Sequence, residues 1–295
     1  MKVEECITSN ELRQGASPSP LWESIIVDAT LKERLRRSAI LALRLRPVLP
    51  FTTTALHGLV LLYGPPGTGK TTLARGLADE LGAVHPGGVR LVEVNPHGLM
   101  SAEHGQSQQL VTQLLCEHIP ALAADGRATV ILLDEVESMA VARSAASLSA
   151  NPADVHRATD AVLTALDRNT TDHHHIVTVA TSNFDKALDE AFKSRADESI
   201  LVPLPSADGI VAILRATLQG FGAVFPGVGA LAGANELSVI AHRLEGLDGR
   251  RVRKVVTDAM KMRSETVLDP NLLSIEDLAA AATRAGIEGG ANAAA

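Results

Sequence analysis

Residues 64–71 read Gly-Pro-Pro-Gly-Thr-Gly-Lys-Thr and match the pattern G-x-x-x-x-G-K-[ST] in full. Glycines in such a loop let backbone N–H groups turn toward a phosphate, and a helix that begins there adds positive potential. Lys70 can then reach the β- and γ-phosphates, and the Thr71 hydroxyl can bind Mg²⁺. The alternative, a Gly/Pro-rich turn without a ligand, is disfavoured because an apolar segment precedes the loop and a helical pattern follows it. The residues expected to contact the nucleotide are Gly64, Pro65, Pro66, Gly67, Thr68, Gly69, Lys70, Thr71 and Thr72.

Two consecutive acids, Asp134 and Glu135, follow the apolar segment 130–133. We expect Asp134 to hold the magnesium ion together with Thr71, and Glu135 to orient and deprotonate the attacking water. Asn183, at the end of another apolar segment, is expected to sense the γ-phosphate and to position the water. The alternatives are ordinary polar ends of buried strands, and two acids downstream of a complete phosphate loop argue against them.

These side chains need a scaffold that brings distant segments to one edge. Short apolar segments at 59–63, 89–94, 130–133, 176–180 and 200–202 alternate with helical patterns. Continuous apolar strands separated by helices predict an α/β fold with a five-stranded parallel sheet covered on both faces. Past residue 205 only helical patterns remain. We therefore expect a flexible lead at 1–20, an α/β domain at 21–205, a small all-helical lid domain at 206–288, and a frayed tail at 289–295.

Composition excludes several classes of protein. The chain has 295 residues, 46% of them apolar, and 27 Lys and Arg against 34 Asp and Glu give a net charge of −7. This balance argues against a protein whose whole surface binds nucleic acid, though not against a local basic channel, and the 2% of aromatic residues leaves few platforms for stacking bases. The apolar runs are too short to span a bilayer. With only two cysteines and no secretion signal, we expect a cytoplasmic protein.

Several segments together resemble the AAA+ ATPases of the pachytene-checkpoint type, which remodel HORMA-domain proteins. Besides the phosphate loop, they are residues 21–25 (Leu-Trp-Glu-Ser-Ile), 134–138 (Asp-Glu-Val-Glu-Ser), 161–167 (Ala-Val-Leu-Thr-Ala-Leu-Asp), 181–183 (Thr-Ser-Asn), 194–197 (Ser-Arg-Ala-Asp) and 246–250 (Gly-Leu-Asp-Gly-Arg). The resemblance implies a homohexameric ring that binds ATP and Mg²⁺ between neighbouring subunits.

The resemblance also implies roles for individual residues. Arg195 would reach the γ-phosphate of the next subunit, and Arg250 would contact phosphate from its own helical lid. Trp22, Ile25 and Ile26 would form the wall of an adenine pocket; for Trp22, a core position that anchors the first helix is the open alternative.

The sequence departs from the eukaryotic members of this family in two places. Only about twenty residues precede Leu21, where those members carry a folded substrate-recognition domain. Such short chains are similar to bacterial members that accompany HORMA proteins and cyclic-oligonucleotide synthases in anti-phage defence. The expected pore loop contains Met100, Glu103 and His104 but no aromatic residue, so substrate grip falls to Met100 and His104, or to residues 143–149.

The leading hypothesis is an ATPase that opens or disassembles a HORMA-domain protein by pulling a segment of it through the ring. Remodelling a HORMA protein bound to a nucleotidyltransferase would switch off second-messenger synthesis. Two alternatives remain: an AAA+ loader or motor acting on DNA, and a nucleotide-gated binding module that hydrolyses ATP very slowly.

Overall fold

The computed structural model describes residues 3–14, 18–100, 106–142, 152–184 and 187–293. The chain divides into two compact units, each described here by itself. The first comprises Met1–Gly64 and Lys70–Val202, and the second comprises Pro65–Gly69 and Pro203–Ala295.

The first unit is built on a six-stranded sheet with the order β1-β3-β4-β5-β2-β6. Its strands are β1 (Ile7–Arg13), β2 (Leu59–Tyr63), β3 (Val89–Val94), β4 (Thr129–Leu133), β5 (Ile176–Ser182) and β6 (Glu198–Leu201). All neighbours pair in parallel except β1, which runs antiparallel to β3. The expected α/β fold with a parallel sheet is therefore confirmed, with one strand more than the five that the sequence predicted.

The additional strand β1 lies within residues 1–20, where we expected a flexible lead. Its seven residues are mostly exposed, so it lacks the alternating apolar pattern that marks a half-buried strand. It joins the sheet through backbone pairing with β3, in which Arg13 lies opposite Val89. Backbone pairing at a sheet edge needs no apolar side chain, and this explains why the sequence pattern did not reveal it.

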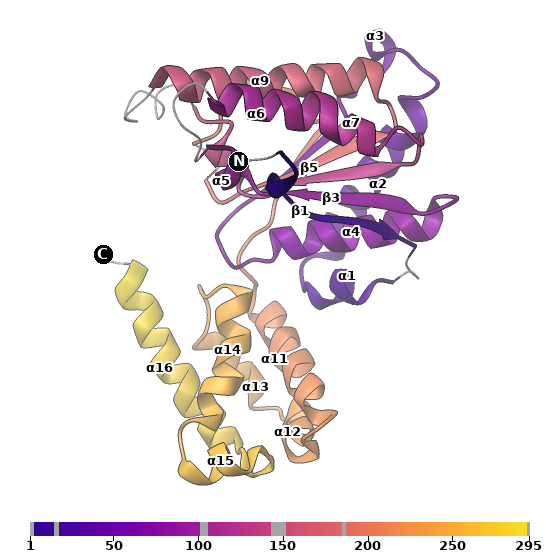
Figure 1. Cartoon of the computed structure of the whole chain (residues 1–295). Helices are drawn as coiled ribbons and strands as arrows, with labels where there is room; N and C mark the ends of the chain where they lie inside the picture. Colours follow the sequence, from indigo (N-terminus) through magenta and orange to yellow (C-terminus); the bar gives the residue numbers. More distant parts are fainter. Residues whose placement is uncertain (1–2, 15–17, 101–105, 143–151, 185–186, 294–295) are drawn as a thin grey trace. The chain divides into compact units, whose positions relative to one another are not determined.

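Alternation along the central strands sends side chains into two separate core layers. Leu59 and Leu61 pack into one cluster, whereas Val60 and Leu62 pack into the other. Figure 1 shows α6 and α9 above the sheet and α1 and α4 below it. The helices of the first layer are α6 (Gln106–Thr112), the π-helical turn η2 (Gln113–His118), α7 (Ile119–Leu122) and α9 (Pro152–Asp172), and those of the second are α1 (Pro20–Ser24), α2 (Ala29–Leu45) and α4 (Lys70–Val84). Shorter elements are η1 (Val3–Cys6), α3 (Phe51–Thr54), α5 (Pro96–Met100), η3 (Val136–Ser138) and α10 (Glu190–Lys193).

Strand register decides which residues meet at the carboxyl edge of the sheet. Leu133 at the end of β4 pairs with Ala180 of β5, and Tyr63 at the end of β2 pairs with Ser182. Strand β5, which ends just before Asn183, is thus the direct neighbour of β2, the strand that leads into the phosphate loop. Ligands of open α/β sheets bind at this edge.

The second unit is helical beyond Pro203. Its elements are α11 (Ala207–Gly222), α12 (Pro226–Ala230), η5 (Leu231–Gly233), α13 (Leu237–His242), α14 (Gly249–Met260), α15 (Ser264–Leu268), η6 (Pro270–Leu272) and α16 (Ile275–Ala293). Asp248 caps α14 by accepting the N–H groups of Arg250 and Arg251, which satisfies donors that the first helical turn leaves unpaired. Helix α16 continues to Ala293 and so includes most of the segment expected to be frayed. In the described ranges, no helix has the length and hydrophobicity to cross a membrane.

Candidate active site

The phosphate loop adopts backbone conformations that favour glycine. Gly64, Gly67 and Gly69 have φ angles of +141°, +77° and +95°, which side chains with a Cβ adopt only at a cost. At Gly64 a Cβ would also lie 2.3 Å from the carbonyl oxygen of Val202. Helix α4 begins at Lys70, so the loop ends at a helix N-terminus, where backbone N–H groups attract an anion.

Lys70 is buried, with 6% of its surface exposed. Its ammonium group donates to the carbonyl oxygen of Gly64 at 2.8 Å and to Oδ1 of Asn183 at 2.9 Å. Burial lowers the pKa of Lys70, while the carboxylates of Glu137, Asp134 and Glu135 act in the opposite direction. The ammonium group is therefore held at the carboxyl edge of the sheet, among three negative charges.

Asp134 lies directly after β4 and is held by two hydroxyl groups. Thr71 Oγ1 donates to Asp134 Oδ1 at 2.7 Å, and Thr181 Oγ1 donates to the same oxygen. The structure thus brings together Thr71 and Asp134, the two residues expected to serve a metal ion. Thr181 is a contributor that sequence reasoning missed, although it belongs to the Thr-Ser-Asn segment.

Glu135 is exposed and has a left-handed backbone, with φ of 52°. Its N–H donates to Thr181 Oγ1 at 3.0 Å, and its Oε1 accepts a hydrogen bond from the side-chain amide of Asn183 at 3.2 Å. A non-glycine residue in this conformation is uncommon and costs energy, and such strain persists where surrounding contacts enforce it. Thr181 holds the backbone of Glu135 and Asn183 orients its carboxylate, which solvent can reach, as a general base requires.

Glu137 is a third acid at the site, and sequence reasoning gave it no role. Its Oε1 accepts the backbone N–H of Asn183 at 3.1 Å, whereas its Oε2 is buried and has no hydrogen-bond partner among the residues that the structure describes. Glu137 therefore fixes the backbone of Asn183, while Lys70 and Glu135 fix its side chain. The signal was present in the Asp-Glu-Val-Glu-Ser segment, where Glu137 stands two residues after Glu135.

A cavity of about 250 Å³ adjoins the acid pair. It is lined by Thr8, Arg75, Glu93, Val94, Asn95, Pro96, Leu132, Asp134 and Glu135. Arg75 and Glu93 pair inside it, with Nη2 and Oε2 2.7 Å apart. The guanidinium group of Arg75 is paired with Glu93, and the carboxylates of Asp134 and Glu135 supply hard oxygen donors that fit a divalent cation such as Mg²⁺. No cluster of three or more His, Cys, Asp or Glu residues that could hold a metal ion by itself occurs in the described part of the chain.

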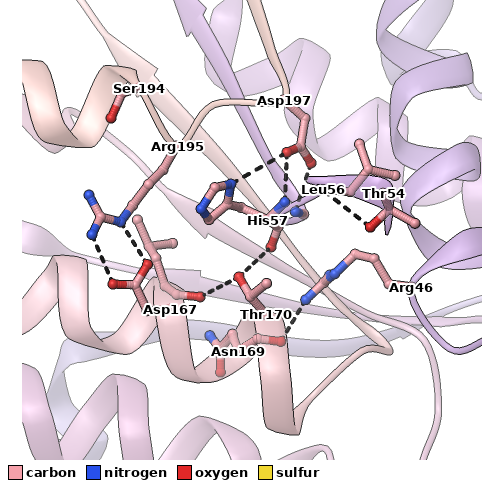
Figure 2. Close-up of polar contacts among 12 residues, drawn as sticks. Arg46, Thr54, Leu56, His57, Asp167, Asn169, Thr170, Ser194, Arg195 and Asp197 are labelled. Atoms are coloured by element: carbon pink, nitrogen blue, oxygen red, sulfur yellow. Dashed lines mark hydrogen bonds and ion pairs between the residues drawn. The ribbon is translucent and has the colours of Figure 1, made fainter. Parts of the chain in front are cut away.

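Arg195 lies between α10 and β6 and is engaged by its own chain. Its Nε and Nη2 donate to the two carboxylate oxygens of Asp167 at 2.7 and 2.8 Å, and its Nη1 donates to the carbonyl oxygen of Ala191 at 2.8 Å. Figure 2 shows this two-point pair, with Asp167 reaching up from α9. The pair raises the pKa of Arg195 and lowers that of Asp167.

The remaining predicted residues lie in different surroundings. Arg250 is exposed in the first turn of α14, in the second unit. Trp22 and Ile25 are buried at 6% and 5% exposure, and Ile26 is partly buried. Trp22 packs closely on α4, because a Cβ at Gly76 would lie 2.7 Å from the Trp22 nitrogen; its role at an adenine ring stays a prediction.

The expected pore loop lies largely beyond what the structure describes. Met100 is the last residue of α5, whereas Glu103, His104 and the second candidate segment 143–149 fall outside the described residues.

Comparison with known proteins identifies the family. Residues 60–204 match the ATPase family associated with various cellular activities (AAA). The chain is 46% identical over 266 residues to CD-NTase-associated protein 6 of Pseudomonas aeruginosa, covering 90% of this chain and 87% of that protein. It is 32% identical over 305 residues to a pachytene checkpoint protein 2 homolog of Sus scrofa, covering 94% of this chain and 70% of that protein.

A solved structure shares the fold. The E. coli MS115-1 HORMA:CdnC:Trip13 complex contains a chain that matches with a TM-score of 0.71 and 18% identity, covering 96% of both chains. The family match and the two sequence relatives show that the chain belongs to the AAA ATPases of the pachytene-checkpoint type.

Proposed function

We propose that this protein uses ATP hydrolysis, as a homohexameric ring, to open or disassemble a HORMA-domain protein. The observation that carries the proposal is the 46% identity to a CD-NTase-associated protein over 90% of the chain, and it is supported by the contacts that join Lys70, Asn183 and Glu135. The name of that relative and the HORMA:CdnC:Trip13 complex point to a HORMA protein and its nucleotidyltransferase as partners. They favour a protein substrate over DNA.

The chemistry we propose is attack of water on the γ-phosphorus of ATP, which releases ADP and phosphate. Lys70 binds the β- and γ-phosphates, and Glu135, oriented by Asn183, takes the proton of the attacking water. Mg²⁺, held by Asp134 and Thr71, would neutralise phosphate charge. All of these residues lie at the carboxyl edge of the sheet. The one further group that the reaction needs is a positive charge that stabilises the transition state.

We assign that charge to Arg195 of the neighbouring subunit, and we assign phosphate contact within the same subunit to Arg250. Arg195 supports this role because its planar, permanently charged guanidinium group suits two-point contacts to phosphate oxygens. In the proposed cycle, hydrolysis moves the helical unit and the pore loop, which includes Met100, and so pulls on the substrate. Such a cycle would regulate bacterial anti-phage signalling in the cytoplasm, where the free thiols of Cys6 and Cys116 would stay reduced.

The test is to reconstitute a complex of a bacterial HORMA protein with its nucleotidyltransferase and to add this protein with ATP and Mg²⁺. Size-exclusion chromatography should show dissociation of the complex with the wild type and its persistence with Glu135→Gln. If the complex survives equally with both proteins while ATP is consumed, HORMA remodelling is wrong.

A further inference from the structure

We propose that Asp197 is a positioning residue for catalysis in the neighbouring subunit, because it clamps the backbone that carries Arg195 to the start of β2. The inference rests on the proposed role of Arg195 as the arginine that acts across the subunit boundary.

The clamp consists of hydrogen bonds between Asp197 and the segment before β2. Oδ1 of Asp197 accepts the N–H of His57, and Oδ2 accepts the N–H of Gly58, both at 2.7 Å. The N–H of Asp197 donates to the carbonyl oxygen of Leu59 at 2.8 Å. Figure 2 shows the carboxylate of Asp197 pointing at the backbone of His57. The side chain of Asp197 is only 3% exposed, and hydrogen bonds to an ionised acceptor are among the stronger ones.

Arg195 is half-buried and lies in a short loop between two fixed points. On one side, Phe192 at the end of α10 is fully buried, and its carbonyl oxygen accepts the N–H of Arg195 at 3.1 Å. On the other side, two residues later, stands the Asp197 clamp. The backbone of Arg195 therefore cannot shift unless one of these two anchors gives way.

The same segment before β2 also contacts the end of α9, the helix that carries Asp167, the partner of the Arg195 side chain. Thr170 Oγ1, near the end of α9, donates to the carbonyl oxygen of His57 at 3.3 Å, and the buried Arg46 donates to the carbonyl oxygens of Asn169 and Ile176. Asp167, which pairs with Arg195, lies in this last part of α9 (Figure 2). The backbone of Arg195 is thus linked to His57 through Asp197, and its side chain is linked to His57 through Asp167 and the end of α9. His57 lies just before β2, the strand that leads into the phosphate loop.

The role that we infer for Asp197 is therefore geometric, since its carboxylate is occupied by the backbone N–H groups of His57 and Gly58. A displacement of about 1 Å in a transition-state contact can cost about 100-fold in rate. Asp197→Asn replaces one acceptor by a donor that would face the N–H of Gly58 or His57, so the clamp cannot form in full. Asp197→Glu keeps both acceptors but lengthens the side chain by one methylene group, and this moves the Arg195 loop.

Rings that contain two kinds of variant subunit can distinguish a role of Asp197 in positioning Arg195 from a role in folding. Subunits with Glu135→Gln, which cannot hydrolyse ATP but carry an intact Arg195, are combined with Arg195→Ala subunits, which can hydrolyse ATP only with an arginine from a neighbour. Rings that contain both are isolated with two affinity tags, and their ATPase rate is measured. Asp197→Asn is then added either to the subunit that donates Arg195 or to the subunit that already lacks it.

The proposal predicts an asymmetric result. Asp197→Asn in the donor subunit should reduce the ATPase rate of the mixed ring about tenfold to 100-fold, and the same change in the Arg195→Ala subunit should alter it less than about twofold. Asp197→Glu should show the same asymmetry with a smaller loss. Equal losses in both placements, or failure of both variants to enter the ring, would mean that Asp197 serves only the fold, and would overturn the proposal. If the parent mixture without any Asp197 change shows no activity, Arg195 does not act between subunits, and the proposed function fails together with this inference.

Discussion

The ammonium group of Lys70 lies 2.9 Å from Oδ1 of Asn183, although 113 residues separate them in the chain. This contact joins the phosphate loop to the residue expected to sense the γ-phosphate, and Asn183 in turn holds Glu135. The three residues form one connected hydrogen-bond path across β2, β5 and β4. The side chain of Asn183 therefore contacts both Lys70, which we expect to bind phosphate, and Glu135, which we expect to direct the water.

Replacing Lys70 should abolish hydrolysis. Lys70→Ala removes the cation among three carboxylates, and we expect the steady-state ATPase rate to fall about 100-fold or more, because preorganised charge is a large part of such catalysis. Nucleotide affinity, measured with a fluorescent ATP analogue, should fall as well. Lys261→Ala, which breaks only a surface pair with Asp258, is the control and should stay within about twofold of the wild type.

Glu137 should matter through the hydrogen bond that it accepts from Asn183. Glu137→Ala leaves the N–H of Asn183 without its acceptor, and we expect kcat to fall about tenfold while nucleotide affinity changes little. Glu137→Gln keeps an oxygen acceptor and should retain most of the activity. If both variants lose activity equally, the negative charge of Glu137 matters rather than this bond; Glu117→Gln, at an exposed position, controls for charge alone.

Gly58 should tolerate no side chain. Its φ is +78°, and a Cβ there would lie 2.0 Å from Nη1 of the buried Arg46. We expect Gly58→Ala to destabilise the protein by roughly 3 kcal/mol, the sum of left-handed strain and overpacking. Gly87→Ala is a matched control, because its φ is +83° but nothing lies within 4 Å of the added Cβ. It should cost about 1 kcal/mol, and thermal unfolding of both variants measures the difference.

The pair between Arg263 and Asp277 should make the helical unit sensitive to acid. Arg263 donates to both oxygens of Asp277 at 2.9 and 2.7 Å, and this contact lowers the pKa of Asp277 from 3.8. Because the folded state then binds fewer protons than the unfolded state, the stabilisation is complete above about pH 5 and is lost as the pH falls through the lowered pKa.

Urea unfolding of Asp277→Asn tests this expectation. At pH 7 the variant should be less stable than the wild type by roughly 1 kcal/mol, after allowance for solvent screening at the partly exposed Arg263. The difference should shrink as the pH falls through the lowered pKa of Asp277. A deficit that stays constant from pH 7 to pH 2 would contradict the ionic origin of the effect.

The fold and the core of the site follow from local sequence features. The phosphate loop requires a fixed spacing of glycines before Lys70 and Thr71, and short apolar runs define the central strands. Asp134, Glu135 and Asn183 could be placed because each lies within three residues of the end of an apolar run, and parallel strands bring their carboxyl ends to one edge. The edge strand β1 could not be found in this way, since its pairing depends on the backbone of β3.

Contacts between distant segments set the limit of what the chain itself reveals. The sequence alone determined the nucleotide chemistry, because that chemistry depends on residue types at short, fixed spacing. Only the tertiary structure decided that Glu137 holds Asn183 and that Asp167 pairs with Arg195. It also decided that Asp197 accepts the N–H groups of His57 and Gly58, which stand 140 and 139 positions earlier in the chain. In a sequence, an exposed aspartate looks the same as a buried aspartate that accepts backbone N–H groups. The path of the folded backbone decides which N–H groups come within hydrogen-bonding distance of its carboxylate.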